Sequence, residues 1–163
     1  LWDMSRGFRA IFESFADAKE MVEILNEPHE IKDVEGAIPL KMSNGEITFN
    51  RISFQFHNRK KVLDSFNLNI KSHEKIALVG VSGAGKSTLT KLLLRLHNIN
   101  KGHILIDGQD ISKVTQESLR KNIAMVPQDP ILFHRTLKEN IRYAKPNATD
   151  KEIIDAAKKA HCH

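Results

Sequence analysis

Residues 80–88 read Gly80-Val81-Ser82-Gly83-Ala84-Gly85-Lys86-Ser87-Thr88, and they fit the pattern G-x-x-x-x-G-K-[ST] of a phosphate loop. The mostly apolar residues 75–79 before the loop predict a short buried strand. Leucines at 89, 92, 93 and 96 after it recur at helical spacing. The motif therefore lies between a strand and a helix, as its chemistry requires, and we predict the α/β fold class.

The predicted chemistry of residues 80–88 is the binding of a nucleotide polyphosphate. Glycines let the backbone turn tightly and bring its N–H groups close to a ligand. The start of the following helix adds unpaired N–H donors and a partial positive charge. Lys86 is expected to reach the β- and γ-phosphates, and the hydroxyl of Ser87 to ligate Mg²⁺. The alternative, a chance glycine-rich turn, is disfavoured by the strand–loop–helix context.

Composition limits the other functional classes. The 163 residues include 25 Lys and Arg against 20 Asp and Glu, a net charge of +5. The basic residues are scattered and there is one Trp and one Tyr, so we expect no nucleic-acid partner. The single cysteine, Cys162, excludes an internal disulfide and fits a reducing compartment. No apolar run reaches the length of a membrane helix and no signal peptide is visible, so we expect this chain to be soluble and cytoplasmic.

The chain divides into three predicted parts. Residues 1–26 predict one amphipathic helix, because apolar residues recur every three or four positions up to Leu25 and Pro28 follows. That helix either packs on its own domain or reaches a partner helix or membrane segment. Residues 27–45 contain Pro and Gly without a sustained period and predict a linker. The last part, 46–163, is predicted to be a second domain.

Alternating apolar and polar residues over 46–70 predict an antiparallel layer of strands, with a polar turn at 57–61. Beyond the phosphate-loop helix we expect a strand at 103–106, a hairpin turn at Asp107-Gly108 and a short helix at 117–121. Residues 123–126 predict a second buried strand, ended by Pro127.

Two helices are expected near the C-terminus. Thr136, with Glu139 three residues later, predicts a capping box for a helix that runs to about Tyr143. Thr149 or Asp150 is expected to cap another helix that runs to the end of the chain.

From about residue 46 onward the sequence resembles the nucleotide-binding domain of an exporter-type ABC transporter. The resemblance depends on the order and spacing of several stretches together with the phosphate loop, which alone would not select a family. The matching stretches are Ile47-Thr48-Phe49, Ile52-Ser53-Phe54-Gln55-Phe56, Val62-Leu63, Ile106-Asp107-Gly108, Leu119-Arg120, Ile123-Ala124-Met125-Val126-Pro127-Gln128, Leu132-Phe133 and Glu139-Asn140-Ile141.

The resemblance implies site residues and cofactors. Phe56 takes the place of the aromatic residue, usually Tyr, that stacks on adenine, and its ring keeps the π-face that stacking needs. Gln128 matches the glutamine that ligates Mg²⁺ and senses the γ-phosphate, so Lys86 and Gln128 are the expected catalytic residues. The simpler alternatives are a core phenylalanine and a surface glutamine. ATP and Mg²⁺ are the implied cofactors.

The resemblance also implies partners. The segment 129–143 is similar to the region that faces the transmembrane domain, and helix 1–26 is similar in position to the cytoplasmic end of the last membrane helix. We therefore expect a transmembrane domain of the same transporter, and a second nucleotide-binding domain in a homodimer or heterodimer, as partners. The expected location is the cytoplasmic face of a membrane.

Later parts of the family pattern are not found in residues 1–163, namely the signature loop Leu-Ser-Gly-Gly-Gln, the Walker B acids and the switch histidine. We therefore predict a P-loop NTPase core of the ABC type, truncated before the signature loop and inactive alone as an ATPase. The alternatives are a small-molecule kinase and a non-catalytic nucleotide-sensing module. A kinase would need a Walker B acid, and its one candidate, Asp107 after the apolar residues 104–106, is followed by Gly108, which favours a turn.

Overall fold

The computed structural model describes the backbone of residues 2–56 and 61–162 and the side chains of 12–56 and 61–162. The chain forms two compact units, residues 1–123 and 124–163. The assignment of 46–163 to one domain remains a prediction.

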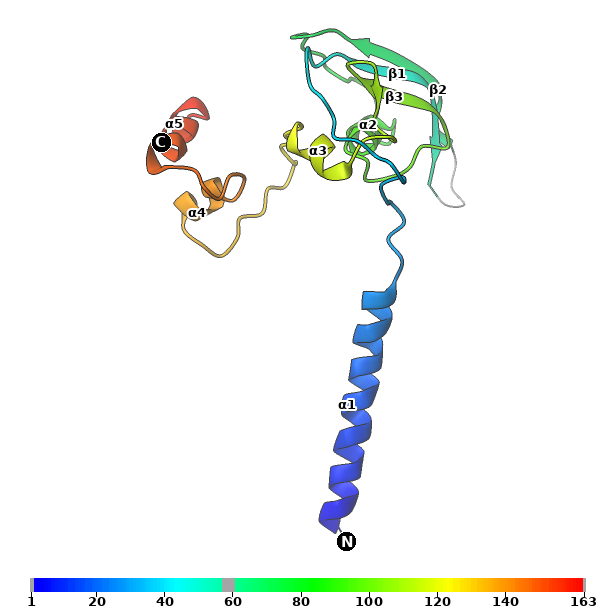
Figure 1. Ribbon diagram of the computed structural model, residues 1–163, viewed down its shortest axis with the longest axis vertical. Coiled ribbons are helices and arrows are strands. Elements are labelled where there is room, and N and C mark those ends of the chain that lie inside the picture. The colour runs from blue at the N-terminus through cyan, green and yellow to red at the C-terminus, as the bar shows by residue number, and fades with distance from the viewer. Residues whose placement is uncertain (1, 57–60, 163) are drawn as a thin grey trace. The chain divides into compact units, whose positions relative to one another are not determined.

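The first unit is built on a four-stranded antiparallel sheet (Figure 1), as the sequence predicts. Its strands are β1 (Ile47–Gln55), β2 (Lys61–Ile70), β3 (Lys101–Ile106) and β4 (Gln109–Asp110), in the order β2-β1-β3-β4. Ile47 pairs with Ile70 of β2 on one side and with Ile106 of β3 on the other. The expected turn at 57–61 lies outside the described residues, except for Lys61, which begins β2.

A β-bulge in β1 keeps the apolar side chains on one face. Phe49 and Ile52 are both buried although they are three residues apart, because the pairing register shifts between them and Arg51 adopts a φ of 48°. Gly102 of β3 lies against this bulge, where a Cβ atom would come within 2.4 Å of the carbonyl oxygens of Asn50 and Arg51. The close approach of the two backbones therefore requires glycine at position 102.

Two helices of the first unit have residues in the same hydrophobic core. Helix α2 (Lys86–Leu93) follows the phosphate loop and buries Leu89 and Leu92. Helix α3 (Gln116–Lys121) buries Leu119. Figure 1 shows α2 beside β1 and β3. The leucine spacing predicts a helix that reaches position 96, but α2 ends at Leu93.

The turn predicted at Asp107-Gly108 is confirmed and also fixes the linker. It joins β3 to β4 with positive φ at both residues, 48° and 75°, which is the type I′ pattern. The Asp107 carboxylate accepts hydrogen bonds from four successive backbone N–H groups, at 2.7–3.1 Å, in residues 43–46. The bond from Ser43, followed by that from Gly45, holds the pKa of Asp107 well below its usual range.

Two predicted buried strands are not formed. Within the described residues, neither 75–79 nor 123–126 has a strand assignment or a ladder partner. Val79 is 92% exposed and Val126 is 91% exposed. Each segment has the apolar character of a central strand, but a strand exists only where a neighbour supplies the hydrogen bonds of the ladder. The prediction that residues 75–79 and 123–126 form buried strands was therefore wrong for this chain.

The second unit contains two short helices, α4 (Leu137–Arg142) and α5 (Asp150–Lys159). Both predicted N-termini are confirmed, because Thr136 with Glu139 and Thr149 with Glu152 each form a complete capping box. Asp150 joins the helices through ion pairs with Lys138 and Arg142. The apolar residues that precede α4 are exposed, namely Ile131, Leu132 and Phe133.

The expected N-terminal helix is present as α1 (Trp2–Asn26). All of its described side chains, from residue 12 onward, are exposed, and these include Phe12, Phe15 and Leu25. Among the described residues no helix is both long and apolar enough to cross a membrane.

We expect Asp107→Asn to destabilise the first unit at neutral pH, because a neutral amide oxygen accepts the four N–H bonds more weakly than a carboxylate. The depressed pKa contributes stability that is present above the ordinary value of 3.8 and is lost as the pH falls through the lower folded value. Urea unfolding at several pH values should therefore show a midpoint difference between wild type and variant that is full at pH 7 and shrinks below about pH 4. Asp155→Asn, at an exposed carboxyl of α5, is the charge control. Equal midpoints at pH 7 would contradict the role of Asp107.

Candidate functional site

The phosphate loop has the open backbone that its sequence predicts. Gly83 and Gly85 have φ values of 82° and 86°, and Gly85 occupies the N-cap of α2 in the left-handed conformation. Among the described residues no group accepts a hydrogen bond from the backbone N–H of Gly85, Lys86 or Ser87. Successive free N–H groups at the start of a helix form an anion-binding site.

The sheet supports the loop from behind. A Cβ atom at Gly85 would lie 2.9 Å from Cγ1 of Val62 and 3.4 Å from its carbonyl oxygen. Gly85 is therefore needed for its left-handed backbone and also for the close contact with β2. This contact holds the loop against a strand that is hydrogen-bonded along its length to β1.

Lys86 is folded across the loop. Its Nζ donates to the carbonyl oxygens of Gly80 and Val81, each at 2.8 Å. The ammonium group therefore lies over the same turn whose N–H groups are free, where it adds a full positive charge to their partial charges. Cation and N–H donors together suit a polyphosphate.

The other predicted loop residues differ in exposure. Ser87 is exposed in the first turn of α2, where its hydroxyl is accessible to a metal ion. Thr88 is 8% exposed, so its side chain belongs to the interior, and its backbone N–H donates to the carbonyl of Gly85 at 3.0 Å. Val81, Ser82, Gly83 and Ala84 are exposed. The roles assigned to these residues remain predictions.

Phe56 lies just after β1, at the end of the sheet that supports the loop. Its neighbour Gln55 pairs with Lys61, the residue before Val62, so Phe56 and the phosphate loop adjoin the same end of β2. The ring is partly buried, with edge contacts to Phe54 at 4.8 Å and to His97 at 5.2 Å between centroids. Stacking on adenine remains a prediction.

Gln128 belongs to the second unit, in a bend, and is exposed. Ser87 belongs to the first unit, and the joint ligation of one Mg²⁺ ion by Ser87 and Gln128 remains a prediction.

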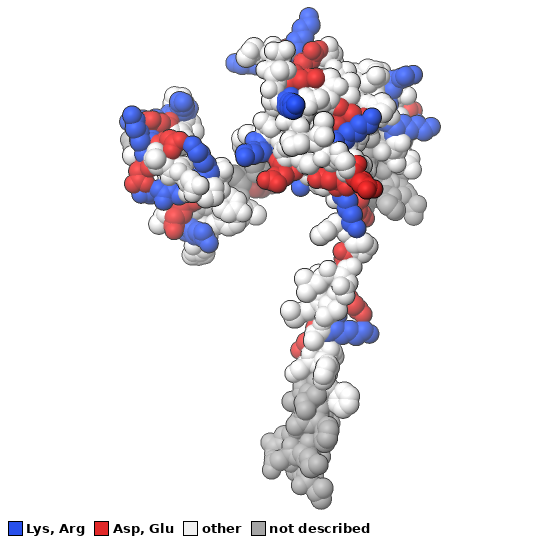
Figure 2. All heavy atoms as spheres, viewed as in Figure 1, with Lys and Arg blue, Asp and Glu red and all other residues white. Residues whose placement is uncertain are grey.

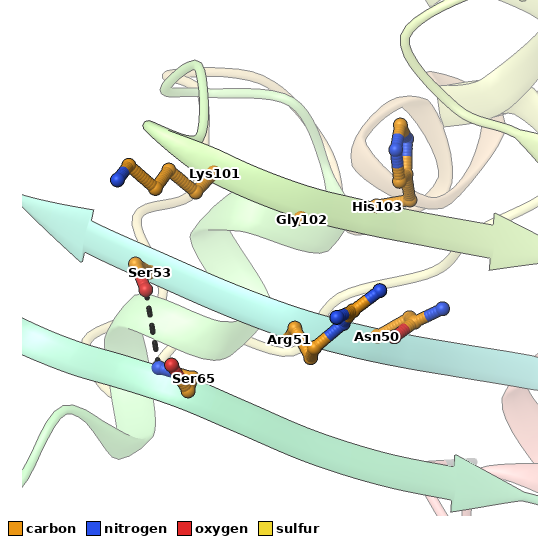
Figure 3. A pocket seen from close by; sticks show the side chains of 7 residues that line it. All are labelled: Asn50, Arg51, Ser53, Ser65, Lys101, Gly102 and His103. Carbon is orange, nitrogen blue, oxygen red and sulfur yellow. Dashed lines mark hydrogen bonds between the residues drawn. The ribbon is translucent and has the colours of Figure 1, made fainter.

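A hollow of about 330 Å³ lies elsewhere, on the polar face of the sheet at the β1 bulge. Figure 3 shows that the side chains of Arg51, Lys101 and His103 point in different directions, and the residues that line the hollow include none of the phosphate loop. His103 is already paired with Asp110 at 2.8 Å. The free N–H groups of the phosphate loop, and not the hollow, therefore mark the candidate functional site.

Basic and acidic residues are interspersed on the face seen in Figure 2, which gives no support to a nucleic-acid surface.

Arg95 is a buried charged residue that was not predicted from the sequence. Its side chain is 5% exposed and donates to the carbonyl oxygens of Ile111 and Val114. A signal was available, because Arg95 interrupts the apolar stripe that includes Leu92 and Leu96, and a buried arginine requires several acceptors.

A family model described as ABC transporter matches residues 63–163. An ATP-binding protein of an uncharacterised ABC transporter from Haemophilus influenzae is 45% identical over 160 residues, which are 98% of this chain and 25% of that protein. The human ATP-binding cassette sub-family B member 6 is 43% identical over 156 residues, 96% of this chain and 18% of that protein. The mitochondrial iron-sulfur clusters transporter of Candida albicans is 42% identical over 163 aligned positions, 90% of this chain and 22% of that protein.

The structure of a bacterial Atm1-family ABC exporter with ATP bound superposes with a TM-score of 0.85 at 38% identity. The match covers 94% of this chain and 27% of that chain, so this chain spans about a quarter or less of these relatives' lengths. The predicted ABC-type P-loop NTPase fold and the family resemblance are both confirmed by these matches. The family match covers more than half of the chain, and on that evidence the chain belongs to the ABC transporter family.

Proposed function

We propose that this chain provides the ATP-binding half-site of an exporter, whose full protein couples ATP hydrolysis to transport across a membrane. The observation that carries the proposal is the phosphate loop, where Lys86 lies across a turn with free N–H groups at Gly85, Lys86 and Ser87. The relatives named above are transport proteins, which favours this function over a small-molecule kinase or a sensing module.

The proposed ligand is ATP with Mg²⁺. The N–H groups and Lys86 would bind the phosphates, and Ser87 and Gln128 would supply oxygen ligands of the type that Mg²⁺ prefers. Phe56 would stack on the adenine from the end of β1. A bound Mg²⁺ ion would supply positive charge to the phosphate oxygens, and the chain's own residues would bind and orient the nucleotide.

The proposed partners are a transmembrane domain and a second nucleotide-binding domain. Fully burying a valine side chain is worth about 1.5–3 kcal/mol, and the exposure of Val79, Val126 and Ile131 in the isolated chain forgoes gains of this size. The exposure of these apolar segments supports the proposal that partner domains cover them in the full protein. The exposed apolar residues of α1 and of 131–133 support contact with the transmembrane domain at the cytoplasmic face of the membrane.

Residues 1–163 alone should bind ATP but not hydrolyse it. Phosphoryl transfer depends on positioning and on electrostatic stabilisation of the transition state. The sequence 1–163 has no Leu-Ser-Gly-Gly-Gln loop and no Walker B acid to orient the attacking water.

Lys86→Ala should weaken the binding of ATP and Mg²⁺ to the full transporter about ten- to a hundredfold, because hydrogen bonds to charged groups are worth roughly 1.5–3 kcal/mol. Titration calorimetry measures the affinity. The matched control is Lys91→Ala, an exposed lysine in the last turn of the same helix. Equal affinity in wild type and Lys86→Ala would refute the proposed site.

Phe56→Ala should cost about 1–3 kcal/mol of ATP affinity, by analogy with base–aromatic stacking, and Phe56→Tyr should bind at least as well as wild type. The loss must appear for ATP and hardly at all for inorganic triphosphate, since the latter has no base. Phe66→Ala, at another partly buried phenylalanine of the sheet, controls for damage to the core. Similar losses for both ligands would mean that Phe56 acts through packing.

Gln128→Ala in the full transporter should lower the ATPase turnover number more than the ATP affinity, because a metal ligand acts mainly on the charge that develops in the transition state. Gln128→Glu keeps an oxygen ligand and should retain more turnover than Gln128→Ala. A large loss of ATP affinity in Gln128→Ala with an unchanged turnover number would contradict the role of Gln128 as a metal ligand.

A further inference from the structure

Two residues beyond the end of helix α2, Arg95 adopts a backbone conformation that favours glycine. Arg95 has a φ of 48°, its N–H donates to Leu92 O at 3.0 Å, and the N–H of Leu96 donates to Lys91 O at 2.9 Å. These bonds form a Schellman motif, in which the left-handed position is usually glycine because a Cβ atom is disfavoured there. A disfavoured backbone at a buried charge indicates that the side chain has a function.

The Arg95 side chain joins the end of α2 to the linker. Its Nη1 donates to the carbonyl oxygens of Ile111 and Val114, at 3.1 and 2.8 Å, and lies 3.4 Å from Oδ1 of Asp33. Its Nη2 donates to the carbonyl oxygen of Lys32 at 3.1 Å. The guanidinium group therefore has acceptors from the interior and from the linker at the same time.

Asp33 continues the connection to α3. Both of its carboxylate oxygens accept from the backbone N–H of Gln116, at 3.0 and 3.2 Å, which is the first residue of that helix. The Gln116 side chain donates to the carbonyl oxygen of Ile31 at 3.2 Å. We call Arg95, Asp33 and Gln116 the linker clamp, since together they bind residues 31–33.

The clamp and the phosphate loop lie at opposite ends of one helix. α2 begins at Lys86, whose side chain spans the loop, and Arg95 is the second residue after its last, Leu93. The linker leads back within a few residues to α1, which ends at Asn26. A helix that is buried along one side moves as a rigid element, so a displacement at the loop is carried to the clamp.

We propose that Arg95 is a positioning residue that couples the phosphate loop to the linker, so that ATP binding tightens the linker clamp on residues 31–33 and thereby the connection to α1. This inference rests on the proposed function, because the signal it transmits is ATP occupancy. A side chain that served only to end α2 would be better replaced by glycine, whereas coupling requires the guanidinium group.

The chain offers a matched pair of variants. Arg95→Gly relieves the left-handed backbone and removes the clamp. Arg51→Gly relieves a backbone with the same φ of 48°, but Arg51 is exposed and its guanidinium group has no partner among the described residues. Differences between these variants therefore report on the clamp and not on the gain of glycine.

The experiment is hydrogen exchange of the full transporter, with and without saturating ATP and Mg²⁺, read at the Gln116 amide, whose N–H donates to the Asp33 carboxylate of the clamp. A coupling free energy of ordinary size corresponds to at least about a fivefold change. ATP should slow exchange at Gln116 by about this factor in wild type and in Arg51→Gly. Arg95→Gly should lose the response while it still binds ATP in calorimetry, with an affinity loss no larger than about the same fivefold factor, because coupling is reciprocal. Arg95→Lys, which keeps the charge but not the two-pronged geometry, should retain part of it.

Several results would overturn the inference. One is a wild-type response that persists in Arg95→Gly, and another is ATP binding to wild type without any change at the Gln116 amide. Failure of wild type to bind ATP would refute the proposed function itself, and the inference with it. If Arg95→Gly does not fold, Asp33→Asn removes the charge partner with little change of shape, and an undiminished response in that variant overturns the inference equally.

Discussion

The burial of Leu89 and Leu92 in the core beneath the antiparallel sheet is the interaction on which the rest of the structure depends. The sheet has one apolar face, and α2 helps to cover it. Because α2 is fixed there, its N-cap residue Gly85 holds the phosphate loop against Val62 of β2, and the turn that follows its C-terminus presents Arg95 to the linker. The anion site and the linker attachment are thus both consequences of how one short helix is buried.

The exposed segments show the opposite situation. Residues 75–79 and 123–126 have apolar sequences that suit central strands, yet in the described part of the chain they have no ladder and much of their apolar surface is exposed. The antiparallel sheet forms within the first unit, because β1 pairs with β2 on one side and with β3 on the other. Loop and sheet can therefore form together, while strands whose neighbours are not supplied locally remain unpaired.

Local features of the fold could be predicted from the sequence, because short-range chemistry determines them. The Asp107-Gly108 turn and the capping boxes at Thr136 and Thr149 involve residues within three positions of one another. The loop conformation follows in the same way from its glycines. Arg95 could not be assigned from the sequence, since its acceptors at 32 and 111 are distant along the chain. The spatial relation of Gln128 to the loop is a matter of tertiary arrangement that no local pattern specifies.

The hydrogen bonds that Asp107 accepts from residues 43–46 have a further consequence, for the chemical stability of the polypeptide. Asn44-Gly45 is a dipeptide type prone to deamidation, because the unhindered glycine nitrogen can attack the side-chain amide carbon of asparagine and release ammonia to form a cyclic imide. In this fold that nitrogen donates to the Asp107 carboxylate at 3.1 Å. The attack would require loss of the hydrogen bond and removal of a proton beside a negative charge. The Asp107 carboxylate, which holds the end of the linker, therefore also slows the deamidation of Asn44.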